Sequence, residues 1–346
     1  MTSLSGSGVP RKRPTMKNVA DLAGVGVKTV SRVINRERHV SADTIARVMQ
    51  AAEQLQYQPD VQAGNLRRAD RRTDTLGLLV GSVANPFSAA VHRAVEDAAI
   101  HRHVAVFASS LDDDPERERA SVEAFLRRRV DGLILTTIQP SRAYLGPQLE
   151  QGMPVVFVDR RPNGLVADTV LTDNLDGAAR ATRHLLGAGH RRIAFLGDSE
   201  DIYTAKERKR GYLEALRLEG VAPDAELVIE NLGEEVQAEA AVNRLLALAD
   251  PPTAIFSAQN LITIGVITAL RAHGASERVA LVGFDDVPMA SLLSPAVTVI
   301  AQDPTAIGAI AARQIFARLD GNAEPAQDFI VPTRLIERGS GEIRPV

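Results

Sequence analysis

Short apolar runs that alternate with helical patterns dominate the chain after residue 75, and they constrain its fold more than any other feature. The seven runs are LGLLV (76–80), VAVFA (104–108), GLILT (132–136), PVVFV (154–158), RIAFLG (192–197), TAIFS (253–257) and VALVG (279–283). Strands that are apolar along their whole length are buried on both faces, which is typical of a parallel sheet covered by helices. Such units over about 270 residues predict two doubly wound lobes. Ligands in these folds bind at the carboxyl ends of the strands, often between two lobes.

A smaller unit with the pattern of three short helices precedes this region. Thr15 is predicted to cap the first helix and Gly24 to end it. The second helix is predicted over 27–35. The third begins at Ser41 and is stopped by Pro59. About 43 residues form only a small core, which fits a module that folds best with a partner.

Charge separates the two parts of the chain. Residues 1–72 hold 13 Lys and Arg against 6 Asp and Glu, a net charge of +7. The remaining 274 residues hold 27 against 37, a net charge of -10. A basic head on an acidic body indicates an anionic partner for the head. Residues 1–14, with the basic cluster Arg11-Lys12-Arg13, are predicted to form a flexible tail.

Composition excludes several classes of protein. With 45% hydrophobic and 24% charged residues, the chain resembles a globular protein and not a disordered one. It contains no run of 18 apolar residues, so no transmembrane helix is expected, and the polar N-terminus does not predict a secretory signal. The absence of cysteine excludes disulfides, thiolate zinc sites and cysteine catalysis.

The sequence predicts neither catalytic nor metal-binding residues. His101 and His103 have no obvious carboxylate partner, and Asp112-Asp113-Asp114-Pro115 is typical of a loop that leads into a helix. No Gly-x-Ser-x-Gly elbow and no phosphate-binding fingerprint after a strand is found. We therefore expect no metal, no cofactor and no enzymatic activity.

The segment TMKNVADLAGVGVKTVSRVIN (15–35) has the layout of a helix-turn-helix motif, with a short Gly-containing turn between two helices. The second helix of such a motif can enter the major groove of DNA. Val27, Lys28 and Arg32 are predicted to face the bases, and lysine or arginine can donate to guanine. The residues predicted to hold phosphates are Thr29, Ser31 and Asn35.

This segment, through V-A-x-L-A-G-V and T-V-S-R-V-I-N, resembles the lactose-repressor (LacI/GalR) family of bacterial regulators. Further motifs follow in the family's order: Tyr57-Gln58-Pro59, Leu66, Asn85-Pro86-Phe87, Val130-Asp131-Gly132, Val158-Asp159-Arg160, Gly189-His190-Arg191-Arg192-Ile193 and Val282-Gly283-Phe284-Asp285-Asp286. The resemblance covers roughly residues 15–340. It implies a small all-α helix-turn-helix head and an α/β effector domain of the type I periplasmic-binding-protein kind, with doubly wound parallel sheets.

The resemblance also implies a domain organisation. A DNA-binding domain is expected over 15–58, a hinge helix or linker over 59–74, and an effector-binding and dimerisation domain over 75–346. The lobes of the last domain are expected to be discontinuous: an N-terminal lobe of about 75–160 and 303–325, and a C-terminal lobe of about 162–300 and 326–346.

In the hinge, the resemblance implies that Leu66 wedges into the minor groove at the centre of the operator, with Ala63 beside it. Leu66 lies in a basic, otherwise polar linker, which agrees with this role. The chain departs from the family's usual residues at Gly26, Asp60 and Gly64. The glycine at 26 loses the side-chain hydrogen bond of a Ser or Thr cap.

The resemblance places the effector cleft residue by residue. Arg208 matches the family's ligand-clamping arginine, whose planar guanidinium suits vicinal hydroxyls or a carboxylate. Asp285 can accept hydrogen bonds from sugar hydroxyls, and Phe87 can cover an apolar face of the ligand. At Gln259-Asn260 the family more often has Asn-Asp, which makes this corner longer and less acidic. The full set of expected effector-binding residues is Asn85, Phe87, Asp159, Arg160, Arg208, Gln259, Asp285 and Gln302.

These features favour a cytoplasmic transcriptional repressor that binds a pseudo-palindromic operator as a homodimer and responds to a small polar effector, such as a sugar or polyol. Two alternatives stay open. A solute-binding receptor would share the two-lobed body, but it gives no reason for residues 15–72. A doubly wound, nucleotide-dependent enzyme would need the missing phosphate fingerprint.

Overall fold

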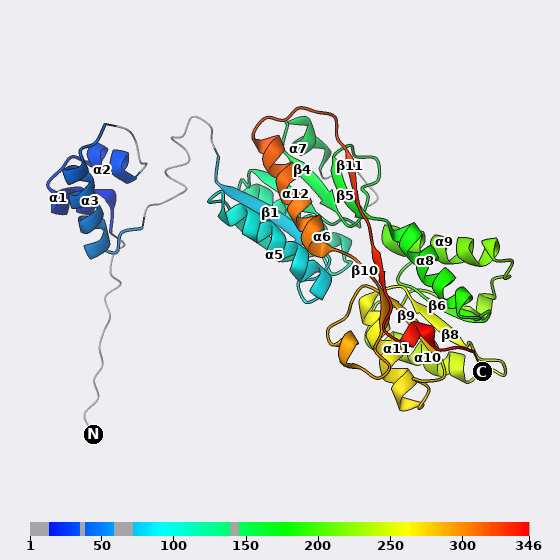
Figure 1. Cartoon of the computed structure of the whole chain (residues 1–346). Helices are drawn as coiled ribbons and strands as arrows, with labels where there is room; N and C mark the ends of the chain where they lie inside the picture. The colour runs from blue at the N-terminus through cyan, green and yellow to red at the C-terminus, as the bar shows by residue number, and fades with distance from the viewer. Residues whose placement is uncertain (1–13, 35–38, 59–71, 139–144, 346) are drawn as a thin grey trace, which may run out of the picture. The chain divides into compact units, whose positions relative to one another are not determined.

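The computed structural model describes residues 14–34, 39–58, 72–138 and 145–345. The chain divides into two compact units, Met1–Thr73 and Asp74–Val346 (Figure 1). The predicted N-terminal tail and most of the predicted linker, including Ala63 and Leu66, lie outside the described residues. No described helix is long and apolar enough to cross a membrane.

The first unit contains three helices, α1 (Met16–Ala23), α2 (Val27–Ile34) and α3 (Ala42–Gln54). Thr15 caps α1 as predicted, and its side chain forms a capping box with Asn18. Gly24 ends α1 in the left-handed conformation, with φ 66°, which glycine adopts at little cost. The three helices share one small core: Val19, Ala20, Ala23, Val30, Val33, Val48 and Ala51.

The third helix ends earlier than the sequence predicts. Ser41 caps its N-terminus as expected, but α3 stops at Gln54 and not just before Pro59. The reason is local, because Gln56 adopts a positive φ of 49°. The chain then folds back, and the Tyr57 N–H donates to the Ala52 carbonyl at 2.8 Å. This closure satisfies a carbonyl at the helix end without proline.

The N-terminal lobe of the second unit is built on a parallel six-stranded sheet of order β11-β5-β4-β3-β1-β2. Its strands are β1 (Thr75–Val80), β2 (Ala105–Ser110), β3 (Gly132–Leu135), β4 (Val155–Val158), β5 (Asp168–Thr172) and β11 (Asp328–Val331). Its helices are α5 (Pro86–Ile100), α6 (Pro115–Arg127), α7 (Gly146–Glu150) and α12 (Pro304–Leu319). Alternate strand residues point to opposite faces: Leu78 packs with α5 and α12, whereas Leu79 packs with α6.

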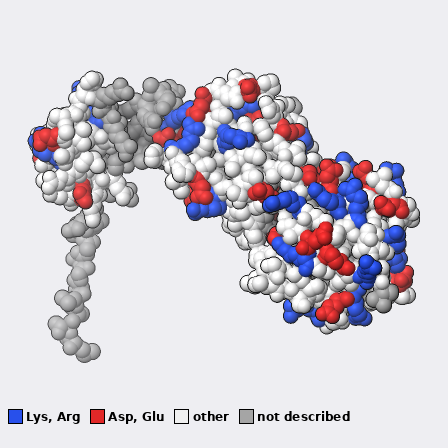
Figure 2. Space-filling model, viewed as in Figure 1, with Lys and Arg blue, Asp and Glu red and all other residues white. Residues whose placement is uncertain are grey.

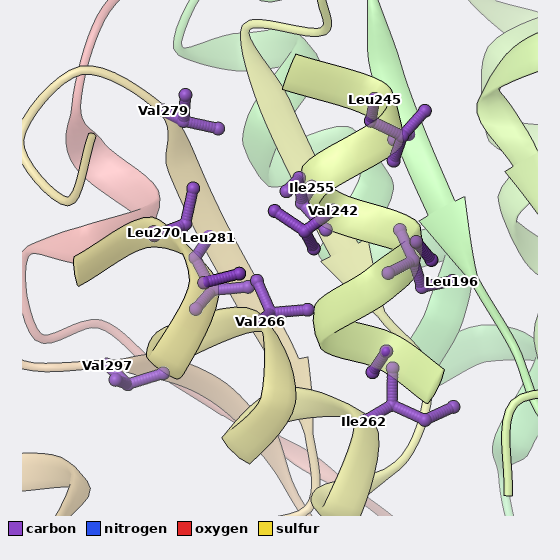
Figure 3. Close-up of a cluster of buried hydrophobic side chains, with 14 of the residues drawn as sticks. Leu196, Val242, Leu245, Ile255, Ile262, Val266, Leu270, Val279, Leu281 and Val297 are labelled. Atoms are coloured by element: carbon purple, nitrogen blue, oxygen red, sulfur yellow. The ribbon is translucent and has the colours of Figure 1, made fainter. Parts of the chain in front are cut away.

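The C-terminal lobe has a second six-stranded sheet, of order β12-β10-β9-β8-β6-β7, in which only β12 is antiparallel. Its strands are β6 (Ile193–Leu196), β7 (Val228–Ile229), β8 (Ala254–Ser257), β9 (Ala280–Phe284), β10 (Thr298–Ala301) and β12 (Arg334–Ile336). Its helices are α8 (Asn174–Gly187), α9 (Tyr203–Leu218), α10 (Glu235–Leu246) and α11 (Asn260–Ala272), with short 3-10 turns at 225–227, 290–292 and 340–342. Figure 3 shows the apolar cluster between α10, α11 and the sheet.

The two sheets confirm the predicted doubly wound fold, and all seven predicted runs form strands. The predicted lobe boundaries were wrong in two places. The strand β5 pairs with β4, and β11 pairs with β5, so both belong to the N-terminal lobe. The N-terminal sheet therefore continues past residue 160, because β5 pairs with β4 in parallel and covers the edge that β4 would otherwise expose.

The chain therefore passes between the lobes three times, after β5, after β10 and after β11 (Figure 1). The crossings are joined by side chains. Thr172, on the first, donates to the side chain of Gln302 on the second. Asp173 accepts from the backbone N–H of Thr333, on the third, at 2.7 Å. The first crossing thus links the other two.

Helices pack closely in pairs on these sheets, and in three pairs a glycine lies at the contact. A methyl group added at Gly265 of α11 would come 2.2 Å from the Glu235 carbonyl oxygen of α10. A methyl group added at Gly211 would come 2.2 Å from the Leu175 carbonyl oxygen of α8, and one added at Gly308 would come 2.6 Å from the Val91 carbonyl oxygen of α5. These pairs are α10–α11, α8–α9 and α5–α12. No larger residue fits without moving a backbone.

Candidate functional site

The helix pair α1 and α2 presents the predicted DNA-reading face. Val30 and Val33 are buried in the core of the unit, which fixes the orientation of α2. Val27, Lys28 and Arg32 lie on the opposite, exposed side of the helix, and Val27 is 46% exposed. Thr29 and Ser31 are half-buried, and Asn35 lies outside the described residues. The face therefore offers two cations and one apolar side chain to a partner.

Gly26 begins α2 without a side-chain cap. Its carbonyl accepts from the N–H of Thr29 at 2.8 Å and of Val30 at 3.2 Å. The helix starts at Val27, as the sequence predicts. Because glycine has no side chain, the first N–H groups of α2 remain available to an outside acceptor such as a phosphate.

A cavity of about 400 Å³ lies between the two lobes of the second unit. It is lined where parallel strands end, which is the usual ligand position in doubly wound folds. The structure brings together all eight residues expected in the effector cleft, since each of them lines this cavity: Asn85, Phe87, Asp159, Arg160, Arg208, Gln259, Asp285 and Gln302. The parallel sheets explain the convergence, because the carboxyl ends of strands far apart in sequence meet at one edge.

Two aspartates at equivalent strand ends adopt a strained backbone. Asp159 follows β4 with φ 67°, and Asp285 follows β9 with φ 72°. Each donates its N–H to the neighbouring strand, at 2.9 Å to Val170 and to Ile300. A positive φ is uncommon for residues with a Cβ atom, and strain of this kind gathers at binding sites. Here it turns both carboxylates toward the cavity.

Arg208 is buried and held on several sides. Its Nε donates to Asn174 Oδ1 at 2.8 Å, and its Nη1 donates to the carbonyl of Ala258 at 2.8 Å. The guanidinium carbon lies 3.8 Å from the centre of the Phe284 ring, a cation–π contact. Burial lowers the pKa of Arg208, and nearby carboxylates oppose that effect. The group stays charged, because an arginine pKa remains far above neutrality.

Asp285 lies beside Arg208, with 4.0 Å between its Oδ2 and the arginine Nη1. Its Oδ1 accepts from Gln302 Nε2 at 2.6 Å. Burial raises the pKa of Asp285, although Arg208 and Gln302 both stabilise its charged form. Gln302 in turn accepts from Thr172 at the first lobe crossing. A hydrogen-bonded chain therefore connects the floor of the cavity to the strands that join the lobes.

Arg160 forms the charged wall of the N-terminal lobe. Its Nη1 lies 2.7 Å from Asp113 Oδ1, and its Nε lies 3.7 Å from Asp159 Oδ2. The side chain is only 10% exposed. Its Nε has no hydrogen-bond partner among the described residues, so one buried donor is available to a ligand.

A pair of amides bridges the lobes across the cavity. Asn260 Nδ2 donates to Asn85 Oδ1 at 2.8 Å, and Asn85 Nδ2 donates to Asn260 Oδ1 at 3.2 Å. Asn85 also caps α5, and Gln259 caps α11 through its Oε1. The corner at Gln259-Asn260 therefore supplies a lobe-to-lobe contact. The side-chain oxygen of Gln259 is already used within its own helix.

Sequence reasoning missed four carboxylates that line the cavity: Asp112, Asp113, Asp198 and Glu234. Asp113 belongs to a segment predicted as a helix start. That prediction is confirmed, because Asp114 caps α6, but the residue before it turns to Arg160. Asp198 is the second residue after β6, and this place just beyond a strand end was the available signal. No group of three metal-ligating side chains that could hold a metal ion occurs in the described parts of the chain.

The acidic character of the second unit is not spread evenly. Figure 2 shows acidic and basic side chains interspersed over the visible face of the C-terminal lobe. The cavity differs, because its acidic lining residues outnumber its two arginines, Arg160 and Arg208. The charge balance inside the cavity is therefore a local property and does not follow from the net charge of the chain.

Comparisons with known proteins agree with both units. Residues 15–60 match the model of bacterial regulatory proteins of the lacI family, and residues 182–341 match a periplasmic binding protein-like domain. The chain is 31% identical to the HTH-type transcriptional repressor PurR of Mannheimia succiniciproducens, over 94% of this chain and 98% of that protein. It is 32% identical to the ribose operon repressor of Escherichia coli K12, over 94% and 99%.

Among solved structures, the lac repressor dimer bound to operator and the anti-inducer ONPF is similar, with a TM-score of 0.84. The two sequences are 25% identical, and the match covers 95% of this chain and 99% of the other. The similarity extends over both the helical unit and the two-lobed unit.

Proposed function

The chain belongs to the LacI family of bacterial regulatory proteins, and from this membership we propose that it is a transcriptional repressor whose affinity for operator DNA depends on a small polar effector. One observation carries the proposal. A helix-turn-helix with two exposed cations and a polar cavity between two lobes occur in the same chain. A solute-binding receptor would not need a helix-turn-helix. An enzyme would need catalytic side chains in the cavity.

In this proposal each predicted domain has its own function. Residues 15–58 bind DNA, 59–74 link the units, and the rest binds effector and a second copy of the chain. Val27, Lys28 and Arg32 read bases in the major groove, and Thr29, Ser31 and Asn35 hold phosphates. Ala63 and Leu66 contact the minor groove. A homodimer places two heads on a pseudo-palindromic operator in the cytoplasm.

The effector that we propose is a sugar or polyol. The cavity combines donors of Arg208, Arg160 and Asn85 with acceptors of Asp285 and Asp159, which suits the alternating hydroxyl groups of such a molecule. Phe87 supplies an apolar wall. The similarity to the ribose operon repressor supports this class of ligand.

Regulation requires that the effector bind two arrangements of the lobes with different affinity. The amide pair Asn85–Asn260 and the chain from Asp285 through Gln302 to Thr172 are the contacts that such a movement would change. A coupling of about 1–3 kcal/mol changes operator affinity roughly 5- to 150-fold.

The test uses the full-length chain and DNA selected from a random-sequence pool. We expect the selected sequences to contain two related half-sites, and a sugar or polyol to change the mobility shift. Failure to select any DNA would overturn the repressor and leave the receptor as the better reading. Selected DNA that responds to no sugar or polyol would overturn the proposed effector class alone.

Three variants check the reading face. Lys28→Ala and Arg32→Ala should each cost about 1–3 kcal/mol of binding free energy and relax base preference. Lys12→Ala, in the basic cluster of the N-terminal segment, serves as the control and should weaken all sequences about equally. Unchanged base preference in both helix variants would place the recognition helix elsewhere.

A further inference from the structure

Resting on the proposed function, we infer that the effector carries no negative charge and that Asp198 is the residue that rejects anionic ligands. The effector is a neutral or positively charged polyhydroxylated molecule. Phosphorylated and carboxylated sugars are excluded, although the cavity contains two arginines.

The first argument is the charge of the cavity wall. Its described lining includes two cations, Arg160 and Arg208. The carboxylates in the same lining are Asp112, Asp113, Asp159, Asp198, Glu234 and Asp285. Even with Arg117, which pairs with Asp112 at 2.8 Å from outside the lining, the acidic groups are in excess. An anion that enters this space meets more like than opposite charge.

The second argument is that each arginine already lies beside a carboxylate of the cavity wall. Arg208 already donates to Asn174 and Ala258, stacks on Phe284 and lies 4.0 Å from Asp285. A phosphate or carboxylate is bound best by two parallel donors of one guanidinium. An anion at Arg208 would have to displace these partners and leave buried polar groups unpaired.

The same holds for Arg160 in the other lobe. Its Nη1 is 2.7 Å from Asp113, and Asp159 lies on its other side, 3.7 Å from Nε. The free Nε can donate one hydrogen bond, which is enough for a hydroxyl oxygen. Asp159 already lies at this edge of the guanidinium, so an anion bound there would meet a carboxylate.

Asp198 is the one carboxylate among the described buried and half-buried lining residues that has no ion-pair partner. Its Oδ1 accepts from the backbone N–H of Ser199 at 2.7 Å, and no ion pair joins it to a cation within 4.0 Å among the described residues. Burial raises the pKa of Asp198 and the charge of Asp113 raises it further, whereas the hydrogen bond from Ser199 and the charges of Arg160 and Arg208 lower it. The half-buried carboxylate therefore faces a space that disfavours more negative charge.

A ligand without negative charge can bind next to Asp198 without electrostatic repulsion. A hydroxyl or a protonated amine can donate to Asp198, which gives a charge-assisted hydrogen bond. A phosphate dianion has no proton to donate and repels it. Discrimination between the two classes then comes from an unfavourable contact with the wrong ligand as much as from a favourable one with the right ligand.

The test is titration calorimetry of the full-length chain with a panel of pentoses and hexoses, each beside its phosphate and, where one exists, its amino form. Ribose with ribose 5-phosphate, and glucose with glucosamine and glucose 6-phosphate, are the first sets. Where a parent sugar binds, we expect its phosphate to bind about tenfold more weakly or worse. A phosphate that binds more tightly than its parent overturns the inference and leaves the proposed repressor intact.

Asp198→Asn, with Asp201→Asn as the matched control, assigns the discrimination. Asp201 lies in the same loop, is exposed and does not line the cavity. In Asp198→Asn the ratio of the dissociation constants of the sugar phosphate and its parent sugar should fall about tenfold. In Asp201→Asn this ratio should stay as in the wild type. An unchanged ratio in Asp198→Asn overturns the role of Asp198. A panel in which nothing binds overturns the proposed sugar effector, and this inference with it.

Discussion

Arg208 is both a proposed ligand contact and a structural residue, because its side chain holds Asn174, Ala258 and Phe284 together. Arg208→Ala leaves Asp285 buried without a cation, so we expect a loss of about 3–5 kcal/mol in the free energy of unfolding. Urea unfolding of the full-length chain, followed by circular dichroism, measures this. A loss below about 1 kcal/mol would show that the pair contributes little.

The double variant Arg208→Ala, Asp285→Asn distinguishes two causes of the expected loss of stability, the unpaired buried charge of Asp285 and the lost packing of Arg208. It removes the stranded charge and keeps an amide that can still meet Gln302. We expect it to be more stable than Arg208→Ala alone, since removing both partners costs less than removing one. Equal or lower stability of the double variant would mean that lost packing, and not the buried charge, dominates.

His190 gives the C-terminal lobe a pH-dependent stability. The ring is buried, with Nδ1 2.9 Å from the Thr253 hydroxyl and Nε2 2.7 Å from the Ile343 carbonyl. Burial lowers the pKa of His190, so the unfolded chain binds a proton more readily than the folded one. The stability that neutral His190 gives is present above pH 6.5 and is lost as the pH falls below it.

We therefore expect a smaller drop in unfolding free energy between pH 7.5 and pH 5.5 in His190→Gln than in the wild type, by up to about 1.4 kcal/mol. Thermal unfolding at the two pH values is the measurement. Because both proteins share every other titrating group, the difference isolates position 190. Identical drops in the two proteins would contradict the assignment.

At the scale of elements, the glycine contacts between paired helices predict an asymmetric response to one added methyl group. In Gly265→Ala the new Cβ meets the Glu235 oxygen at 2.2 Å, and we expect a loss of about 1–3 kcal/mol in unfolding free energy, or more if α10 cannot shift. The control is Gly187→Ala, near the end of α8, where nothing lies within 4 Å. It should be neutral or stabilising by up to about 1 kcal/mol. If Gly187→Ala were destabilised and Gly265→Ala were not, the close contact between α10 and α11 would not be what requires glycine at position 265.

The strands that could be predicted are those that are apolar throughout. Of the four edge strands, only β2 gave such a signal: β7 has two residues, and β11 and β12 are partly exposed. Their placement depends on pairing with distant segments, which local sequence does not encode. The short apolar segment of β5 was missed for a related reason, because the lobe crossing after it can be located only once β4 and β11 are in place.

The same reasoning divides the cavity residues. Asp159, Arg160 and Asp285 follow strongly apolar runs and belong to motifs of the resemblance, so the two signals together predicted them. Asp198 also follows such a run but lies in no recognised motif. Asn260 makes its lobe-to-lobe contact with Asn85, on the other lobe. Contacts between lobes depend on three-dimensional closure, which no pattern along one strand can reveal.

For the whole molecule, the separation of charge predicts strongly salt-dependent DNA binding. The head carries a net charge of +7 over residues 1–72, whereas the rest of the chain is acidic. Each neutralised phosphate contributes about -0.9 to the slope of log K against log salt. We expect a slope steeper than about -3 for the dimer on its selected operator. Anisotropy titrations at several salt concentrations measure it, and a shallower slope would exclude a dimer that clamps the backbone.

The three crossings between the lobes also have a consequence for how the protein is made. On the ribosome, β1 to β5 emerge early, but the α12 residues that cover them, such as Ile307 and Ile315, are encoded roughly 130 residues later. At about 5–20 residues per second, translation of that gap takes about 7 to 26 seconds. Throughout this interval the face of the nascent sheet that α12 will bury is open to solvent and to other apolar chains. The N-terminal lobe is thus begun first and completed nearly last, and its uncovered apolar face is a site where the nascent chain can aggregate during this interval.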